Sequence, residues 1–339
     1  MTLALAIATA ALGGTPGKRS VLNVPARRPA AILSFSANPT MAELSRARVF
    51  EESLAPVGRR PTPIENATLA AALLGYAQRS GPDDFSSLTA FLEEEPTSPW
   101  RAAVLTGLGS EYYNTAHYSL ALAAWREAWS HANEARDPNA IAVVDRAVSE
   151  LAYLYARLGR MKQLETLLNS VKDRLFLGES GRKITGAREA LWMMKKHPEV
   201  SFRCGPLALE SIRRALDPRA PLPMAIFNSA STTQGFSLAE VAELSKEVGL
   251  NYQMAFREPG GAFIVPSVVH WKVGHYAAIV RQVGDRYLVE DPTFRNTVWP
   301  TREALEEETS GYFLVPRANC SRAGAPWRRR KAGMSGARG

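Results

Sequence analysis

Residues 201–212, SFRCGPLALESI, place a cysteine directly before an amphipathic helix. Pro206 suits the first position of a helix, where its missing N–H is not needed. The apolar residues that follow recur at helical spacing as far as Leu216. We therefore predict a buried helix over 206–216 with Cys204 at its N-terminus. Unpaired backbone N–H groups and the helix dipole favour a thiolate there, and the thiolate is the nucleophilic form of cysteine.

A second stretch supplies a base and a carboxylate for this cysteine. His275 opens an apolar strand, and Asp291 follows the next strand after a turn that begins at Gly284. This pattern predicts a β-hairpin with the histidine at the entry of one strand and the aspartate at the exit of the other. The chain order is Cys, His, Asp. His270 is an alternative base, although it precedes the apolar run instead of opening it.

The register of this hairpin decides whether the two side chains share a face. A two-residue turn at Gly284 and Asp285 would place Asp291 on the opposite face from His275. A loop that also includes Arg286 would place Asp291 on the same face as His275, with the two side chains meeting diagonally.

Composition bounds the protein class. The 339 residues are 46% hydrophobic and 22% charged, which is typical of a soluble globular chain with room for two cores. Residues 317–339 carry seven basic side chains and no acid, so they account for most of the formal net charge of +8. We read them as a basic disordered tail and expect no nucleic acid partner.

Cysteine usage excludes two further classes. The chain has only two cysteines, Cys204 and Cys320, and the second lies in the basic tail. This count argues against a disulfide scaffold, against a Cys-rich metal site and against a bridge between the two. We expect no cofactor and no metal.

The N-terminal residues 1–14 are apolar and end in Gly13-Gly14, like a signal peptide, but they lack a basic n-region. An apolar segment packed on the body is the alternative, and a double-glycine leader that is removed by self-processing is another. We assign 1–40 to a signal or linker. Beyond it no apolar run reaches the roughly 18 residues of a spanning helix. A secreted or cell-envelope location is favoured, with the cytoplasm as the alternative.

Residues 41–196 read as a helical domain. A first helix is expected from about Thr40 to Leu54, a break at 178–181, and a last helix over 183–196. Between them lie three degenerate units with starts near 66, 102 and 145.

These units resemble the tetratricopeptide repeat, in which small residues let two antiparallel helices approach closely. Such an array usually offers a concave surface to a peptide or protein partner, so we interpret it as a docking module. The aromatic residues of the middle unit either line that surface or belong to the core: Tyr112, Tyr113, Tyr118, Trp125 and Trp129.

Residues 197–316 read as an α+β domain with helices first and an antiparallel sheet after. Ser237 and Glu240 form a capping box before a helix that Gly249 closes. The expected helices cover 206–216 and 238–248, and the expected strands cover 251–256, 262–265, 275–282, 286–290 and 312–315.

This second domain resembles the bacteriocin-processing (double-glycine) cysteine peptidases, which have a papain-like fold. The resemblance runs from about Phe202 to Val315 and includes CGP at 204–206, GFSL at 235–238, GHY at 274–276 and EDP at 290–292. It implies a peptide or protein substrate and cleavage after Gly-Gly. Helical repeats followed by such a domain also resemble the N-terminal part of large Rhs-type bacterial surface proteins.

The resemblance implies a role for each candidate residue. It makes Cys204 the nucleophile, His275 the general base and Asp291 the residue that orients the imidazole. The same chemistry follows from acyl transfer, in which a thiolate attacks and an imidazolium protonates the leaving amine. The structural alternatives are a small buried apolar residue for Cys204 and a turn former for Asp291.

One departure from that family keeps other functions open. The family has a glutamine shortly before the cysteine that helps to form the oxyanion hole, and residues 196–201 contain none. Asn228 or Gln234 could substitute, and His197 is expected at the surface. The alternatives are a catalytically impaired domain that binds peptides, and a transglutaminase-like acyl transferase that uses the same three residue types.

Overall fold

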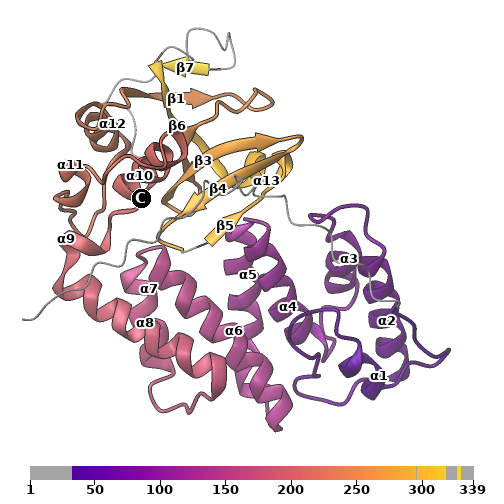
Figure 1. The fold of residues 1–339 in the computed structure, drawn as a ribbon. Coiled ribbons are helices and arrows are strands. Elements are labelled where there is room, and N and C mark those ends of the chain that lie inside the picture. Colours follow the sequence, from indigo (N-terminus) through magenta and orange to yellow (C-terminus); the bar gives the residue numbers. More distant parts are fainter. Residues whose placement is uncertain (1–32, 295, 318–326, 330–339) are drawn as a thin grey trace, which may run out of the picture.

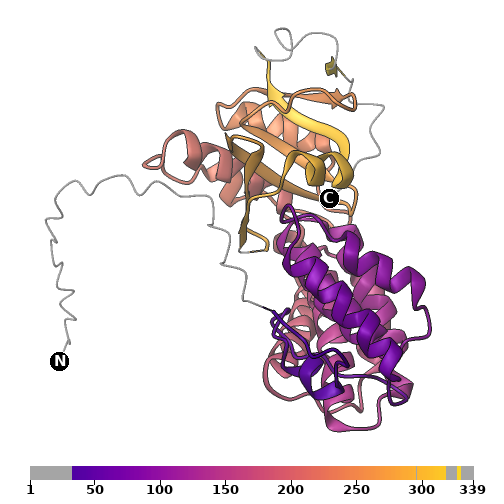
Figure 2. The same cartoon turned by 90° about the vertical axis from the view of Figure 1, so that its right-hand side faces the viewer.

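The computed structural model describes residues 33–294, 296–317 and 327–329, which form two lobes (Figures 1 and 2). A helical lobe extends to Lys196, and a second lobe carries one antiparallel sheet with its own helices. Residues 1–14 and Cys320 lie outside the described residues. Within them, no helix combines the length and the apolar character needed to cross a bilayer.

The helical lobe contains eight α-helices among the described residues. They are α1 (Met41–Arg46), α2 (Pro63–Ala77), α3 (Ser86–Glu94), α4 (Arg101–Asn114), α5 (Tyr118–Ser130), α6 (Pro138–Arg157), α7 (Met161–Ser170) and α8 (Gly178–Lys196). The first predicted helix was too long, because Arg48 takes a positive φ of 50° just after α1 ends.

The predicted break at 178–181 was wrong, since α8 begins at Gly178. A Cβ on Gly181 would lie 2.9 Å from the Phe176 carbonyl oxygen. This glycine therefore permits a close backbone approach at the start of the helix and does not interrupt it.

Neighbouring helices of the lobe pack against one another, and α4 and α5 come into close contact. A Cβ on Gly109 of α4 would lie 2.5 Å from the indole Nε1 of Trp125 on α5. The same Nε1 donates a hydrogen bond to the Thr106 carbonyl oxygen at 3.2 Å. A small residue thus admits a large one across the pair, as the sequence pattern required. The likeness to tetratricopeptide repeats itself stays a prediction.

The second lobe is built on a sheet of seven strands in the order β5-β4-β3-β2-β6-β1-β7. The strands are β1 (Tyr252–Arg257), β2 (Ser267–Trp271), β3 (His275–Val283), β4 (Arg286–Asp291), β5 (Asn296–Val298), β6 (Thr309–Pro316) and β7 (Trp327–Arg329). The helices are α9 (Pro198–Ser201), α10 (Cys204–Leu216), α11 (Met224–Phe227), α12 (Leu238–Glu247) and α13 (Arg302–Glu308). The capping box of Ser237 and Glu240 is confirmed at the start of α12.

Two sequence predictions fail in this lobe. The strand expected at 262–265 is a loop, because the Arg257 guanidinium binds the Gly261 carbonyl oxygen and lies 3.8 Å from the Phe263 ring. Phe263 and Ile264 are buried there without a strand partner. The tail is not disordered at Trp327–Arg329, which pair with β1 as β7. Trp327 is buried and donates to the Ala262 carbonyl oxygen at 3.0 Å.

Each face of the sheet is covered differently. Helices α10 and α12 pack on one face around Val268, Tyr276 and Leu314. The other face, with Val269 and Trp271, shares one continuous core with the helical lobe. The two lobes are thus joined through a common core, and the sheet lies between the helical lobe and α10 (Figure 1).

Buried polar contacts add to this junction. The Glu308 carboxylate, 1% exposed, accepts hydrogen bonds from the backbone N–H and the hydroxyl of Ser119 at 3.0 and 2.6 Å. The Thr301 hydroxyl binds the Asp83 carboxylate. Because a buried carboxylate is costly without donors, these contacts favour one relative placement of the lobes.

Candidate active site

Cys204 is the first residue of α10 and is 7% exposed. The helix begins two residues earlier than predicted, so Pro206 is its third residue. Proline is tolerated there because no N–H of the first turn has an intrahelical acceptor. No side chain caps this terminus. The uncapped N–H groups therefore remain available to an anion beside the cysteine sulfur.

The neighbouring Gly205 lets α10 approach the second helix of the lobe. A Cβ at this position would lie 2.5 Å from Val241 Cγ2 on α12 and 3.4 Å from the Tyr276 ring. The first turn of α10, which carries the cysteine, is therefore tightly packed against α12 and β3. Only glycine fits beside it with the present helix spacing.

Two contacts hold the segment before Cys204. The Arg203 guanidinium donates to the carbonyl oxygens of Ile226 and Phe227, the latter at 3.2 Å. The backbone N–H of Phe202 donates to the Ser231 hydroxyl, also at 3.2 Å. Residues from the α11 loop therefore set the approach of the chain to the cysteine.

His275 and Asp291 form a buried pair beside this cysteine. His275 Nε2 lies 2.7 Å from Asp291 Oδ2, and both residues are almost fully buried, at 2% and 3% exposure. A carboxylate only accepts hydrogen bonds, so Nε2 carries the proton of this contact. Asp291 Oδ1 accepts from the backbone N–H groups of Thr293 and Phe294 at 3.0 and 3.1 Å. The carboxylate is fixed at both oxygens, and Nδ1 is the imidazole nitrogen left for Cys204.

A β-bulge brings the pair to the same face. Val283 pairs with Arg286, so the turn contains only two residues and the longer loop considered from the sequence does not form. The register then shifts between Ile279 and Arg281, and Ala278 pairs with Glu290. Asp291 consequently follows the register of residue 277, on the same face as His275.

The charge state of the imidazole follows from its neighbours. Burial alone lowers the pKa of His275, but the Asp291 carboxylate and the adjacent Cys204 outweigh it through charge and hydrogen bonding. The pKa of His275 rises to about 10 as a result. The imidazole therefore holds two protons at neutral pH and forms an ion pair with Asp291.

Phe294, which lies between β4 and β5 and which the sequence did not single out, connects this site to the helical lobe. The Phe294 ring stacks on the His275 imidazole with centroids 4.8 Å apart and an interplanar angle of 10°. The Tyr118 ring from α5 packs edge-on against the Phe294 ring, with the ring centroids 5.2 Å apart. No motif marks Phe294, because it follows the DP turn in an irregular stretch.

The remaining sequence candidates lie apart from this cluster. His270 pairs with Tyr276 across β2 and β3, on the opposite face from His275, and its Nδ1 lies 2.8 Å from the Ser310 hydroxyl. His197 is exposed, as expected. Asn228 and Gln234 are exposed on the loop that Ser231 joins to the segment before Cys204.

Comparisons with known proteins found similarity over part of the chain. The profile of the Peptidase C39 family matches residues 199–321. A solved structure, described as a double glycine motif protease from an AMS/PCAT transporter in complex with the leader peptide, is 20% identical over 33% of this chain and 81% of that chain, with a TM-score of 0.29. No curated protein matches. The family match supports a cysteine peptidase kind of function for the second lobe.

Proposed function

We propose that residues 197–316 form a cysteine peptidase domain in which Cys204, His275 and Asp291 carry out the reaction. The observation that supports this most is the buried His275–Asp291 pair, joined at 2.7 Å, beside a cysteine at an uncapped helix N-terminus. A buried ion pair with a structural role alone would not need a cysteine as its third member. Perturbed histidines next to a nucleophile are typical of catalytic sites.

The chemistry follows from where the protons lie. The Cys204 thiolate attacks the peptide carbonyl carbon, and the backbone N–H of Cys204 donates to the oxyanion that forms. The His275 imidazolium gives its Nδ1 proton to the amine, which leaves as the C–N bond breaks. Neutral His275 then takes a proton from water, whose oxygen attacks the thioester carbon and releases Cys204 as thiolate. Asp291 keeps the imidazole oriented and stabilises its charged form.

The second oxyanion donor is the weakest part of the proposed site. The family resemblance leads one to expect a glutamine before the cysteine, and residues 196–201 lack it. Loss of one such donor typically lowers the rate by about a hundred- to a thousandfold. Asn228 and Gln234 lie on the loop tethered to this segment, so either could move to the site when substrate binds. Without a substitute, the domain would bind a peptide and cut it slowly or not at all, which is the alternative function.

The substrate is a peptide or protein, and cleavage after Gly-Gly is the preference that the resemblance suggests. The helical lobe is proposed as the docking module, because it shares a core with the sheet face that carries His275. A partner held on that lobe would lie close to the catalytic pair.

The test begins with the cysteine, since it needs no substrate. The alkylation rate of Cys204 by iodoacetamide is measured against pH in a Cys320→Ser background, alone and with His275→Ala. We expect a rate that stays high well below pH 8.5, near which a free cysteine loses its proton, and that falls at least tenfold in the histidine variant. His270→Ala is the matched control and should leave the rate unchanged. A rate that follows an ordinary thiol in both proteins would refute the proposal.

A second step separates peptidase from the alternatives. A peptide with an internal Gly-Gly is incubated with the chain, with and without a primary amine, and products are identified by mass. Cleavage with a new carboxylate supports hydrolysis, and an amine adduct would assign acyl transfer instead. Binding without either product, in a chain whose Cys204 is activated, would assign the impaired peptide-binding function.

A further inference from the structure

A pocket of about 290 Å³ opens in the helical lobe, between α4, α6 and α8. Phe294 forms part of its wall, and the same ring stacks on His275. The pocket therefore lies behind the imidazole and is separate from Cys204. The proposed peptidase chemistry uses none of its polar residues.

Arg157 is the cation of this pocket that no carboxylate pairs with in the described part of the chain. Its guanidinium donates to the hydroxyl oxygens of Tyr113 and Tyr153, the latter at 2.8 Å. It also stands 4.1 Å above the Tyr153 ring and 5.5 Å from the Phe294 centroid. Within 33–294, 296–317 and 327–329, no ion pair joins Arg157 to an acid. Phenols and ring faces satisfy its donors but leave its charge uncompensated.

The hydroxyl groups of the two tyrosines provide further hydrogen-bond donors beside the Arg157 guanidinium. A phenol oxygen that accepts from a guanidinium has its own O–H left to donate, and the accepted bond strengthens that donation. Burial, together with the nearby Asp291 carboxylate, outweighs Arg157 and raises the pKa of Tyr113 to about 12, so its hydroxyl keeps the proton. The pocket thus presents the O–H groups of Tyr113 and Tyr153 beside the Arg157 charge.

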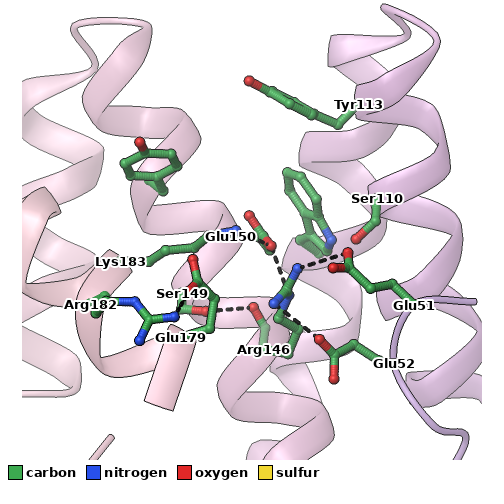
Figure 3. A network of polar contacts seen from close by, with 12 residues as sticks. Glu51, Glu52, Ser110, Tyr113, Arg146, Ser149, Glu150, Glu179, Arg182 and Lys183 are labelled. Carbon is green, nitrogen blue, oxygen red and sulfur yellow. Dashed lines mark hydrogen bonds and ion pairs between the residues drawn. The ribbon is translucent and has the colours of Figure 1, made fainter. Parts of the chain in front are cut away.

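The other charged groups of the pocket are already paired, as Figure 3 shows. Arg146 lies 3.0 Å from Glu52, 2.7 Å from Glu150 and 3.5 Å from Glu51, and Lys183 binds the same Glu150 oxygen as Arg146 does. With Glu52, which pairs with Arg146 from just outside the lining, three carboxylates face three cations, so the cluster as a whole is neutral. The three carboxylates gather on Arg146 and Lys183, so Arg157 is the cation that they leave to a ligand. A singly charged anion matches that one cation, whereas a dianion would be repelled by Glu51 and Glu150.

We propose that this pocket binds one carboxylate group of a peptide, either an acidic side chain or a C-terminal carboxylate, between Arg157, Tyr113 and Tyr153. Binding does not depend on the proposed peptidase function. A link to His275 does, because Phe294 is a wall of the pocket and also the stacking partner of the imidazole. A bound carboxylate that moves Phe294 would change the position of His275.

Calorimetry on the full chain tests the binding. The probes are the α-amide of N-acetylglutamate, whose one carboxylate is the side chain, and acetyl-Ala-Ala for the C-terminus, each against its neutral amide, with inorganic phosphate as the dianion. We expect at least one acid to bind ten times more tightly than its amide and than phosphate, and to weaken as salt is raised from about 50 to 200 mM. The acid that binds shows whether the carboxylate comes from an acidic side chain or from a C-terminus. Equal affinity of acid and amide, or no binding of either acid, would overturn the proposal.

Variants locate the bound carboxylate. Arg157→Gln should weaken the acid at least tenfold, and Tyr153→Phe, which keeps the ring and removes the hydroxyl, at least threefold. Arg126→Gln is the matched control, because Arg126 also donates to a tyrosine hydroxyl, that of Tyr155 at 3.4 Å, outside the pocket. Should Arg157→Gln fail to fold, Tyr153→Phe carries the test. Unchanged affinity in the folded variants would refute the assignment.

The link to His275 is read from Cys204 alkylation with and without the bound acid. A change of at least twofold in rate, absent in Arg157→Gln, supports it. Carboxylate binding without such a change refutes the link to His275, while the proposed binding site still stands. Failure of the proposed function appears separately, as a Cys204 rate that ignores His275→Ala while the calorimetric result stands.

Discussion

Replacement of Asp291 by asparagine tests the central pair, because it keeps the shape of the side chain and removes its charge. Two of the interactions that raise the pKa of His275 come from Asp291, through its charge and its hydrogen bond, while burial opposes them. Without the carboxylate, burial is opposed by Cys204 alone, and the pKa of His275 should fall from about 10 toward its ordinary 6.5. At about 1.4 kcal/mol per pKa unit, a fall in the pKa from about 10 to 6.5 corresponds to roughly 5 kcal/mol.

The sign of the pH dependence follows from the direction of this shift. A histidine whose pKa is raised by folding stabilises the folded state fully below about pH 6.5, and this contribution is lost as the pH rises toward 10. Asp291→Asn lacks it at every pH. The difference in the free energy of unfolding between wild type and variant should therefore be largest near pH 6, of the order of 5 kcal/mol, and shrink toward pH 10.

Two measurements check this. Long-range ¹H–¹⁵N spectra of the imidazole nitrogens follow the protonation of His275 directly, and urea unfolding at pH 6 and pH 10 gives the stability difference. Asp285→Asn is the matched control, because it makes the same change at the turn of the same hairpin. If His275 titrated near 6.5 in the wild type, or if Asp291→Asn left its titration unchanged, the description of the pair would be wrong.

Three other substitutions probe the surroundings of the pair. Phe294→Leu removes the ring stacked on the imidazole, so the Cys204 alkylation profile should shift along the pH axis in a variant that still folds, and an unshifted profile would exclude a positioning role. Gly205→Ala should cost about 1–3 kcal/mol, visible as a lower urea midpoint, because the new Cβ would meet the stiff side chain of Val241. Glu308→Gln should lower the free energy of unfolding by about 1–3 kcal/mol, because an amide would replace the carboxylate that accepts from Ser119. An unchanged urea midpoint would show that this contact does not join the lobes.

Local patterns predicted much of the second lobe. The capping box at Ser237, the glycine that ends α12 and the apolar stripe of α10 each act within a few residues, and all are observed. The loop at 262–265 was mistaken for a strand because it is a short apolar run, and a buried loop with Phe263 and Ile264 gives the same pattern. What keeps it irregular is Arg257, whose bonds to the Gly261 carbonyl oxygen replace a strand partner.

Contacts between distant segments left no signal that could be read from one sequence. Phe294 follows Asp291 by three residues, yet its role depends on Tyr118 from α5, far earlier in the chain. Likewise, the buried Glu308 finds its donors on Ser119, far away in the sequence. Such pairs are set by how the lobes pack, and hydrophobic periodicity carries no information about that.

The hairpin between His275 and Asp291 shows how a local irregularity decides a site. A regular ladder from the two-residue turn would have put these side chains on opposite faces of the sheet, and the chain order Cys, His, Asp would then have been a coincidence of spacing. One extra residue, inserted between Ile279 and Arg281, changes the parity of every position beyond it. The bulge leaves a ladder position unpaired, which is a loss for the sheet, and its effect is to place Asp291 at 2.7 Å from His275. A sheet selected for stability alone has no reason to keep such a defect there, so the bulge itself is an argument that the pair serves a function.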